Sequence, residues 1–574
     1  MKTEKQALKN TLLKNGDYKS TKDVFLRLAE MYPNTNILAN LKEGGNEIEY
    51  HSAKDILCDI EKVGNAFLEL GFKNKHIAII AENCYEYIIT DMAIVGGLGV
   101  VTPIDKDANG ELLITLLNKC EANVIVCSSF ELVKIEKIKK DCPYIEKIIT
   151  IDRKIEGYLF LKELMSQIDL NKSNEYRNLE IDYDKTCQLL FTSGTTGPNK
   201  LVEICQRNMA ANITNCIDVI KSSSKENTSM SVLPMHHATE INTHILPRIA
   251  CARLTYINDS MKTMMENIKI FKPYVITVVP MIANMFYKTI WQKAKKHGMD
   301  GKLKKGIKLC GFLKKFGIDI THKLFKEIYV PFGGNLEQIV CGGAALNPEV
   351  VKGFSDLGVF IVNGYGITEC GPLVSMNTDT LAEVKSIGKV CPKLEAKIDS
   401  PDENGVGELC IKGESVAKGY YKDQEATESV FDDDGFFHTG DSAIIDKKGR
   451  IFLSGRKKNT IVLDNGKNVY PEEIETDIIN TLDYLKEVVV YQGEIMDKNQ
   501  TKTVICAGVY IDSENAQPIE KIKQDFIAIN QKLPGYKRIA YVDLVDSEYE
   551  KTSTRKIKRD IAEKRHTLDK GILI

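Results

Sequence analysis

The sequence predicts an α/β protein with a large N-terminal domain of parallel α/β sheets, a β-rich subdomain and a small, mobile α+β C-terminal domain. Three observations support this prediction. Short β-branched runs alternate with helix-like stretches over most of the chain, as is typical of parallel sheets. From about residue 397 the runs become shorter and are separated by Gly and Asp turns. Beyond residue 455 a further mixed α/β unit begins.

The expected elements follow in chain order. The clearest strand runs of the first part are residues 76–80, 123–127, 274–279 and 337–341. The β-rich part is expected to have strands at 405–413 and 449–455, and the last unit strands at 487–491 and 503–510 with a helix near 519–533. We therefore place the N-terminal domain at 1–455, its β-rich subdomain at about 390–455, a hinge at 456–460 and the C-terminal domain at 461–574.

Composition excludes several classes of protein. Of the 574 residues, 77 are Lys or Arg and 79 are Asp or Glu, and this net charge of −2 argues against a nucleic-acid partner bound through bulk positive charge. No apolar run approaches the ~18 residues that a membrane-spanning helix needs. The run 93–104 is short and contains glycines, so we expect it in the core. The polar N-terminus does not resemble a secretory signal, and we expect a cytoplasmic protein.

Cysteine and histidine spacing indicates no metal cluster of a known pattern. The 15 cysteines are scattered without a Cys-x-x-Cys pair, which favours reduced, buried thiols. The nine histidines include no His-Glu-x-x-His spacing, which argues against a dedicated transition-metal site.

The strongest local motif is residues 189–200, LLFTSGTTGPNK, in which a hydrophobic run leads into glycines, hydroxyl residues and a lysine. Glycines let backbone N–H groups approach an anion closely, and Lys200 adds positive charge. The loop is not a Walker A motif, because Leu201 stands where a Ser or Thr would bind Mg²⁺. The alternative is a flexible Ser/Thr/Gly turn.

Two further segments each end an apolar strand in a glycine turn, where α/β sheets bind ligands: 341–346 (CGGAAL) and 363–369 (NGYGITE). Tyr365 can present its ring to a planar base, and Glu369 offers an oxygen ligand suited to Mg²⁺. The alternative is a tight turn followed by a surface glutamate.

Three weaker motifs complete the set: 437–441 (FHTGD), 455–459 (GRKKN) continuing to 466–475, and 551–559 (KTSTRKIKR). Asp441 can accept hydrogen bonds from a ribose diol, and Arg456 can bind ribose or phosphate oxygens with two N–H groups. Taken singly, each segment has a simpler interpretation. The first is typical of a common Gly-Asp turn, the second of a solvated basic loop and the third of a basic tail.

In this order, the five motifs, with 341–346 and 363–369 counted as one, resemble the adenylate-forming superfamily, which includes acyl-CoA synthetases, luciferases and peptide-synthetase adenylation domains. The resemblance covers nearly the whole chain. Residues 82–87 and 233–240 are most similar to the long-chain fatty acyl-CoA synthetases of this AMP-binding group. No Asp lies in 233–240, which argues against α-amino acid substrates.

The resemblance implies a role for each matching residue. Contacts with the ATP phosphates are implied for Thr192, Ser193, Gly194, Thr195, Thr196, Gly197 and Lys200. Contacts with the nucleoside are implied for Gly343, Ala344, Asn363, Tyr365, Gly366, Asp441 and Arg456. The catalytic set would be Thr368 at a phosphate, Glu369 on Mg²⁺, His237 near the acyl carboxylate, and Lys556 between that carboxylate and the α-phosphate. Asn459 falls at the hinge and Gly466 beside the CoA channel.

The implied reaction uses ATP, Mg²⁺ and CoA to convert a medium- or long-chain fatty acid to acyl-CoA through an acyl-adenylate, with release of AMP and pyrophosphate. Two alternatives remain: an enzyme that transfers the acyl group to an acyl carrier protein, and a nucleotide-binding pseudo-enzyme. Leu201 replaces the Gly that usually follows the loop lysine, which favours reduced activity.

Residues 287–327 contain 12 lysines and three acidic residues, interleaved with Ile, Leu and Phe. Such a basic amphipathic segment can lie on an anionic bilayer, and this interpretation predicts peripheral contact with the inner membrane face. The alternative is a solvated helical face over buried apolar positions.

Overall fold

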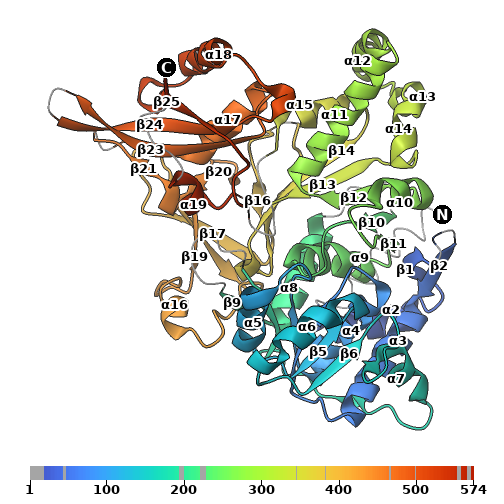
Figure 1. The fold of residues 1–574 in the computed structure, drawn as a ribbon. Coiled ribbons are helices and arrows are strands. Elements are labelled where there is room, and N and C mark those ends of the chain that lie inside the picture. The colour runs from blue at the N-terminus through green and yellow to red at the C-terminus, as the bar shows by residue number, and fades with distance from the viewer. Residues whose placement is uncertain are drawn as a thin grey trace. The chain divides into compact units, whose positions relative to one another are not determined.

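The computed structural model describes residues 18–42, 45, 47–192, 200–219, 228–343, 346–381, 383–464, 467–497, 500–551, 557–564 and 571–574. The chain divides into two compact units, and Figure 1 labels many of their elements. The first unit comprises Met1–Thr192, Lys200–Glu395 and Ile411–Phe437, and the second comprises Ser193–Asn199, Ala396–Cys410 and His438–Ile574. The domain limits and the hinge at 456–460 stay a prediction.

One sheet of the first unit has the strand order β7-β6-β5-β3-β4-β8-β9. Every neighbouring pair is parallel except β8 and β9, as the alternating pattern predicts. Apolar side chains on both faces are buried because helices cover a parallel sheet on its two sides. The strands are β3 (His76–Ile80), β4 (Val100–Pro103), β5 (Val124–Cys127), β6 (Lys147–Thr150), β7 (Leu159–Phe160), β8 (Thr186–Phe191) and β9 (Leu201–Cys205).

The other sheet of the first unit has the order β16-β15-β14-β13-β12-β10-β11-β1-β2. Its central pairs, from β14 to β1, are parallel, and antiparallel pairs complete both ends. The strands are β1 (Asn36–Leu41), β2 (Ile48–Ser52), β10 (Ser229–Ser231), β11 (Thr255–Ile257), β12 (Val275–Val278), β13 (Gln338–Gly342), β14 (Phe360–Gly366), β15 (Leu373–Asn377) and β16 (Gly388–Val390).

The helices of the first unit begin at recognisable signals. Ser52 and Asp55 form a capping box at α3, and Pro280 opens α11. No helix of the described residues is long and apolar enough to cross a bilayer. The helices are α2 (Thr21–Met31), α3 (Ala53–Glu69), α4 (Tyr85–Ala93), α5 (Gly110–Lys119), α6 (Leu132–Ile138), α7 (Leu161–Gln167), α8 (Gln206–Val219), α9 (Leu246–Ala250), α10 (Met264–Phe271), α11 (Pro280–Lys296), α12 (Asp300–Lys314), α13 (Thr321–Leu324), α14 (Lys326–Tyr329), α15 (Pro348–Asp356) and α16 (Gln424–Glu428).

Four neighbouring strands, in the order β17-β18-β19-β20, lie mostly in the second unit. This unit also contains a sheet in the order β23-β24-β25-β26. Helices α17 and α18 pack their buried faces into one core with this second sheet. The elements are β17 (Leu394–Asp399), β18 (Gly407–Gly413), β19 (Phe437–Ile445), β20 (Arg450–Arg456), β21 (Ile461–Val462), β22 (Asn468–Val469), α17 (Pro471–Thr481), β23 (Glu487–Asp497), β24 (Gln500–Tyr510), α18 (Ile519–Lys532), β25 (Ile539–Val545), α19 (Arg559–Glu563) and β26 (Ile572–Leu573).

The packing of α3 gives a first test of the fold. A Cβ added at Gly64 would lie 2.2 Å from the ring of Tyr176, which is fully buried. Gly64→Ala is therefore expected to lower the free energy of unfolding by about 1–3 kcal/mol, measured by urea denaturation. The control is Gly301→Ala in α12, where no atom lies within 4 Å of the added Cβ. It should raise stability by roughly 0.5–1 kcal/mol. Equal stability of the two variants would contradict this packing.

Candidate functional site

The ends of β13 and β14 bring two predicted nucleotide-binding segments side by side. The strands pair in parallel with Gly342 opposite Gly364, so both segments emerge at the same edge of the sheet. Asn363 and Tyr365 are buried in β14, whereas Gly343, which follows β13, is exposed. Backbone and side-chain groups of the two segments can therefore line one binding surface at a sheet edge, where α/β folds hold ligands.

The chain turns sharply after β14. A Cβ at Gly366 would lie 2.2 Å from the carbonyl oxygen of Pro372, so only glycine fits there. The turn leads into a short 3-10 helix, Thr368–Cys370, which carries the predicted phosphate-contacting threonine and the predicted metal ligand Glu369. Of the predicted residues in this region, Ala344 lies outside the described residues.

Glu369 and Lys200 are linked through a third residue, Tyr420. The Tyr420 hydroxyl donates to Oε1 of Glu369 at 3.0 Å, and Nζ of Lys200 lies 4.4 Å from the centre of the Tyr420 ring. The backbone N–H of Ala417 also donates to the Glu369 carbonyl at 2.8 Å. These contacts bring the last residue of the predicted phosphate loop and the predicted Mg²⁺ ligand to the same place in the first unit.

Tyr420 was missed by the sequence analysis. It is 7% exposed, and burial, followed by the neighbouring Glu369 carboxylate, raises the pKa of its hydroxyl well above the usual range. The hydroxyl therefore stays protonated and acts as a hydrogen-bond donor to Glu369. The local signal was the Gly419-Tyr-Tyr421 run, an aromatic pair after a glycine, but no spacing rule connects it with Glu369, 51 positions earlier.

The glycine-rich loop joins two antiparallel strands. The N–H of Thr192 donates to the carbonyl of Lys200 at 3.0 Å, which closes the β8–β9 hairpin at the base of the loop. The predicted phosphate-binding residues between them, Ser193, Gly194, Thr195, Thr196 and Gly197, lie outside the described residues. Leu201 is 1% exposed and packs in the core below this hairpin. Where the family pattern has a glycine, this chain therefore has a buried core side chain at the start of β9.

In the second unit, Asp441 and Arg456 face each other on β19 and β20. Nε of Arg456 lies 2.9 Å from Oδ1 of Asp441, and Nη1 of Arg456 donates to the carbonyl of Thr439 at 3.2 Å. The Asp441 side chain is 10% exposed and that of Arg456 is 43% exposed. The pair presents an oriented carboxylate beside a guanidinium, a combination suited to the hydroxyl groups of a ribose.

The predicted hinge residue lies three positions further on. Asn459 ends the 3-10 helix Lys457–Asn459, and its Nδ2 donates to Oε1 of Glu472 at 2.5 Å. An antiparallel bridge between Lys551 and Ile557 brackets residues 552–556. Lys556 and Gly466 themselves lie outside the described residues, so their roles stay predictions.

His237 lies in the first unit against its neighbour His236, with ring centres 4.1 Å apart. Burial lowers the pKa of His237 to about 3 and that of His236 to about 4, and the proximity of His236 lowers the pKa of His237 further. Both imidazoles are therefore neutral at physiological pH. A neutral ring can donate a hydrogen bond from its N–H group to an acyl carboxylate without forming an ion pair with it.

This burial predicts a pH dependence of stability. Below pH 6.5 the unfolded chain binds a proton on His237 that the folded protein does not bind, so the free energy of unfolding falls as the pH falls from 6.5 towards 3. His237→Asn should reduce the loss of stability between pH 7.5 and pH 5.0 by roughly 2 kcal/mol in urea titrations. His297→Asn, at an exposed position, is the control. An unchanged pH dependence in His237→Asn would contradict the neutral, buried ring.

A buried polar network supports the segment that follows His237. In the π-helical turn Thr239–Ile245, Oε1 of Glu240 lies 2.9 Å from Nδ1 of His244. Nε2 of His244 lies 3.2 Å from the Ser229 hydroxyl, which in turn lies 3.0 Å from the Thr255 hydroxyl. These four side chains are almost fully buried, so the network fixes the turn against β10 and β11.

The fold and these segments define an AMP-binding type of enzyme, and comparison with known proteins agrees. A model of the family described as "AMP-binding enzyme" matches residues 25–421. The chain belongs to this family. The match ends at Tyr421, directly after the tyrosine that contacts Glu369.

Relatives and solved structures extend the comparison. Long-chain-fatty-acid–CoA ligase 5 of Rattus norvegicus is 27% identical over 493 residues, which are 80% of this chain and 71% of the relative. Long-chain-fatty-acid–CoA ligase 1 of Cavia porcellus is 26% identical, covering 80% and 70% of the two chains. Among solved structures, ATP-bound MatB from Rhodopseudomonas palustris has a TM-score of 0.76 at 21% identity, covering 95% of this chain and 99% of MatB. The anthranilate CoA ligase AuaEII with anthranoyl-AMP also has a TM-score of 0.76, at 18% identity and with 96% and 98% covered. These structural neighbours share the predicted α/β fold.

Proposed function

We propose that this protein is an ATP-dependent acid–thiol ligase that converts a medium- or long-chain fatty acid to acyl-CoA through an acyl-adenylate. The observation that carries the proposal is the contact of Lys200 and Glu369 with Tyr420, since it joins a phosphate-loop lysine to an oriented carboxylate. Family membership and relatives named as long-chain-fatty-acid–CoA ligases support the reaction class.

The first half-reaction must bring two anions together. A fatty acid carboxylate attacks the α-phosphate of ATP, and negative charge accumulates on the phosphate oxygens as pyrophosphate leaves. Lys200 would face the leaving phosphates, and Lys556 would lie between the carboxylate and the α-phosphate. One positively charged group of this kind in a dry site is worth on the order of 3–4 kcal/mol of transition-state stabilisation.

Glu369 is the residue that would hold Mg²⁺. Its carboxylate is half-buried and oriented by Tyr420, and carboxylate oxygen is a ligand that Mg²⁺ accepts together with phosphate oxygens. When bound, the ion would supply positive charge to the phosphates. By the resemblance to the family, Asp441 and Arg456 would hold the ribose, and Asn363 and Tyr365 would contact the adenine.

The second half-reaction needs a thiol where Lys556 had been. A C-terminal domain that turns about Asn459 would withdraw the lysine and open a channel for the pantetheine arm of CoA beside Gly466. The thiol then gives up its proton to solvent, its sulfur attacks the acyl carbonyl to form a thioester bond, and AMP leaves with the electron pair of the broken acyl–oxygen bond. His237, neutral near the acyl carboxylate, would orient that group for both steps.

Product mass spectrometry tests the proposal. The purified protein would be incubated with ATP, Mg²⁺ and a panel of fatty, aryl and amino acids, with and without CoA. We expect acyl-CoA from medium- or long-chain fatty acids, with AMP and pyrophosphate. Acyl-AMP that accumulates while CoA is ignored would instead indicate a carrier-protein acceptor. ATP binding without either product would indicate a pseudo-enzyme and overturn the proposal.

The fatty acid proposal includes peripheral membrane contact through residues 287–327. In this segment several apolar side chains of α12 to α14 and their connections are exposed between lysines: Leu309, Phe312, Phe316, Ile318 and Leu324. We expect co-sedimentation with anionic vesicles that falls as salt is raised, and at least a severalfold loss of binding for Phe312→Ser with Phe316→Ser. Equal sedimentation of the wild-type protein with neutral and anionic vesicles would contradict the electrostatic part of this contact.

A further inference from the structure

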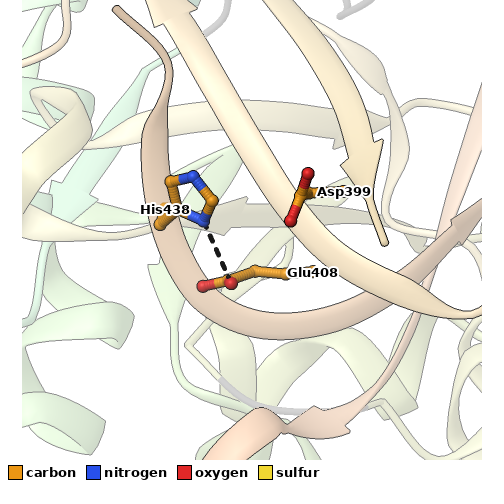
Figure 2. A group of neighbouring side chains, drawn as sticks. All are labelled: Asp399, Glu408 and His438. Carbon is orange, nitrogen blue, oxygen red and sulfur yellow. Dashed lines mark hydrogen bonds and ion pairs between the residues drawn. The ribbon is translucent and has the colours of Figure 1, made fainter. Parts of the chain in front are cut away.

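Three neighbouring strands place a histidine and two carboxylates of the second unit together. Asp399 ends β17, Glu408 lies at the start of β18 and His438 at the start of β19. One ligand atom from each lies within 4.8 Å of the other two. Figure 2 shows the three side chains converging from their strands, with Nδ1 of His438 directed at Glu408.

A thiol adds a fourth donor to the same place. Cys410 follows Glu408 by two positions on β18, so both side chains project from the same face of the sheet. Its Sγ lies 3.5 Å from Nδ1 of His438, and Nδ1 lies 3.0 Å from Oε2 of Glu408. Ligand atoms around a tetrahedral Zn²⁺ lie about 3.3–3.8 Å apart, from metal–ligand distances near 2.0–2.3 Å. The two distances from His438 are close to this spacing, and side-chain rotations that bring Asp399 and Cys410 closer would complete the set around one ion.

The combination of donors selects the class of ion. Imidazole, thiolate and carboxylate together suit Zn²⁺ and Co²⁺, whereas Mg²⁺ and Ca²⁺ prefer sites built from oxygen alone. Cys410 is fully buried and Glu408 is 8% exposed, but the His438 side chain is 25% exposed. The cluster is thus held rigidly on one side and can be reached from solvent on the other.

Lys457 competes for this position. Its Nζ lies 2.7 Å from Oε2 of Glu408, and the Lys457 side chain is 62% exposed. Burial disfavours the ionised form of Glu408, but hydrogen bonds from Lys457 and His438 more than offset this and hold its pKa below the usual range. Because Lys457 is mostly exposed, turning its ammonium group into water costs little, and the negative carboxylate then becomes available to a metal ion.

We propose that Asp399, Glu408, Cys410 and His438 form a binding site for a divalent transition-metal ion of the Zn²⁺ class, which displaces Lys457 when it binds. The site uses no residue assigned to ATP, the acyl group or CoA. Its test therefore does not depend on the ligase activity.

Cobalt titration of the purified full-length chain, first treated with a chelator, tests the site. We expect one Co²⁺ per chain with visible bands of a tetrahedral centre and a near-ultraviolet thiolate-to-Co²⁺ band. Zn²⁺ should displace Co²⁺, and excess Mg²⁺ should not. His438→Gln and Asp399→Asn should each weaken Co²⁺ binding at least about tenfold. Replacing a residue that only hydrogen-bonds to a metal ligand already lowers metal affinity by about that factor. Cys410→Ser should remove the near-ultraviolet band.

Lys457→Met provides a test that loss of folding cannot imitate. Removing the competing ammonium group should tighten Co²⁺ binding about two- to fivefold. This factor corresponds to the free energy of an ion pair with one exposed partner. His297→Gln, which removes an exposed imidazole from the first unit, should change neither affinity nor spectrum. Equal Co²⁺ affinity in the wild-type protein, His438→Gln and Lys457→Met would overturn the proposed site.

Discussion

Replacing Lys556 with alanine is expected to lower the rate of acyl-adenylate formation by about 10²–10³-fold while thioester formation from supplied acyl-AMP stays near the wild-type rate. The physical reason is that the lysine offsets charge only where the carboxylate meets the α-phosphate. In the second half-reaction the α-phosphate belongs to the leaving group and the attacking thiol takes the place of the lysine. The two half-reactions would be measured separately, by pyrophosphate exchange and by acyl-CoA formation from acyl-AMP.

Lys558→Ala is the matched control for this variant. Lys558 lies two residues away on the other side of the bridge at Ile557, and its ammonium group pairs with Glu550. It contributes a similar charge to the same segment without a predicted role in catalysis, so both half-reactions should stay within about twofold of wild type. If Lys556→Ala slowed both half-reactions to the same degree, the assigned role of Lys556 would be wrong.

Asp441→Asn is expected to raise the KM for ATP by roughly ten- to a hundredfold. The change removes a charged acceptor for the ribose hydroxyls and weakens the 2.9 Å ion pair that orients Arg456. A hydrogen bond to a charged group contributes about 1.5–3 kcal/mol, and 1.4 kcal/mol corresponds to a tenfold change in affinity. Steady-state kinetics with ATP as the varied substrate would measure the effect.

A comparison of ATP with 2′-deoxyATP separates a ribose contact from a general loss of structure. If Asp441 binds the ribose, the wild-type protein should prefer ATP and Asp441→Asn should lose most of that preference. Asp446→Asn is the matched control, since Asp446 forms a 2.8 Å ion pair with Arg450 at the other end of the same hairpin. An undiminished preference for ATP in Asp441→Asn would show that the ribose lies elsewhere.

Much of the fold was predictable from local patterns. The run at 76–80 coincides with β3, and the runs at 405–413 and 449–455 overlap β18 and β20 with ends that differ by at most two residues. Buried parallel strands are nearly continuous runs of β-branched residues. Their ends can therefore be predicted from where the hydrophobic run stops and a glycine turn begins. The predictions of the fold class and of the family were also confirmed. Both rested on motifs that lie at strand ends, which local patterns reveal.

Strand order and side-chain neighbours could not be predicted in this way. The contact of Tyr420 with Glu369 spans 51 positions, and no periodicity connects two such residues. Leu201, which the sequence marks as a departure in the phosphate loop, is a core residue of β9. A motif shows which residue departs from a pattern, but the packing around it decides what the departure changes.

Residue types at short spacings were enough to predict the α/β class, the order of the motifs and the type of chemistry. Which distant side chains meet depends on the packing of the folded chain. Histidine spacing argued against a transition-metal site, yet Asp399, Glu408 and His438 lie together. The physical reason is that backbone hydrogen bonds place three strands side by side, and this pairing joins residues that are up to 39 positions apart in the chain.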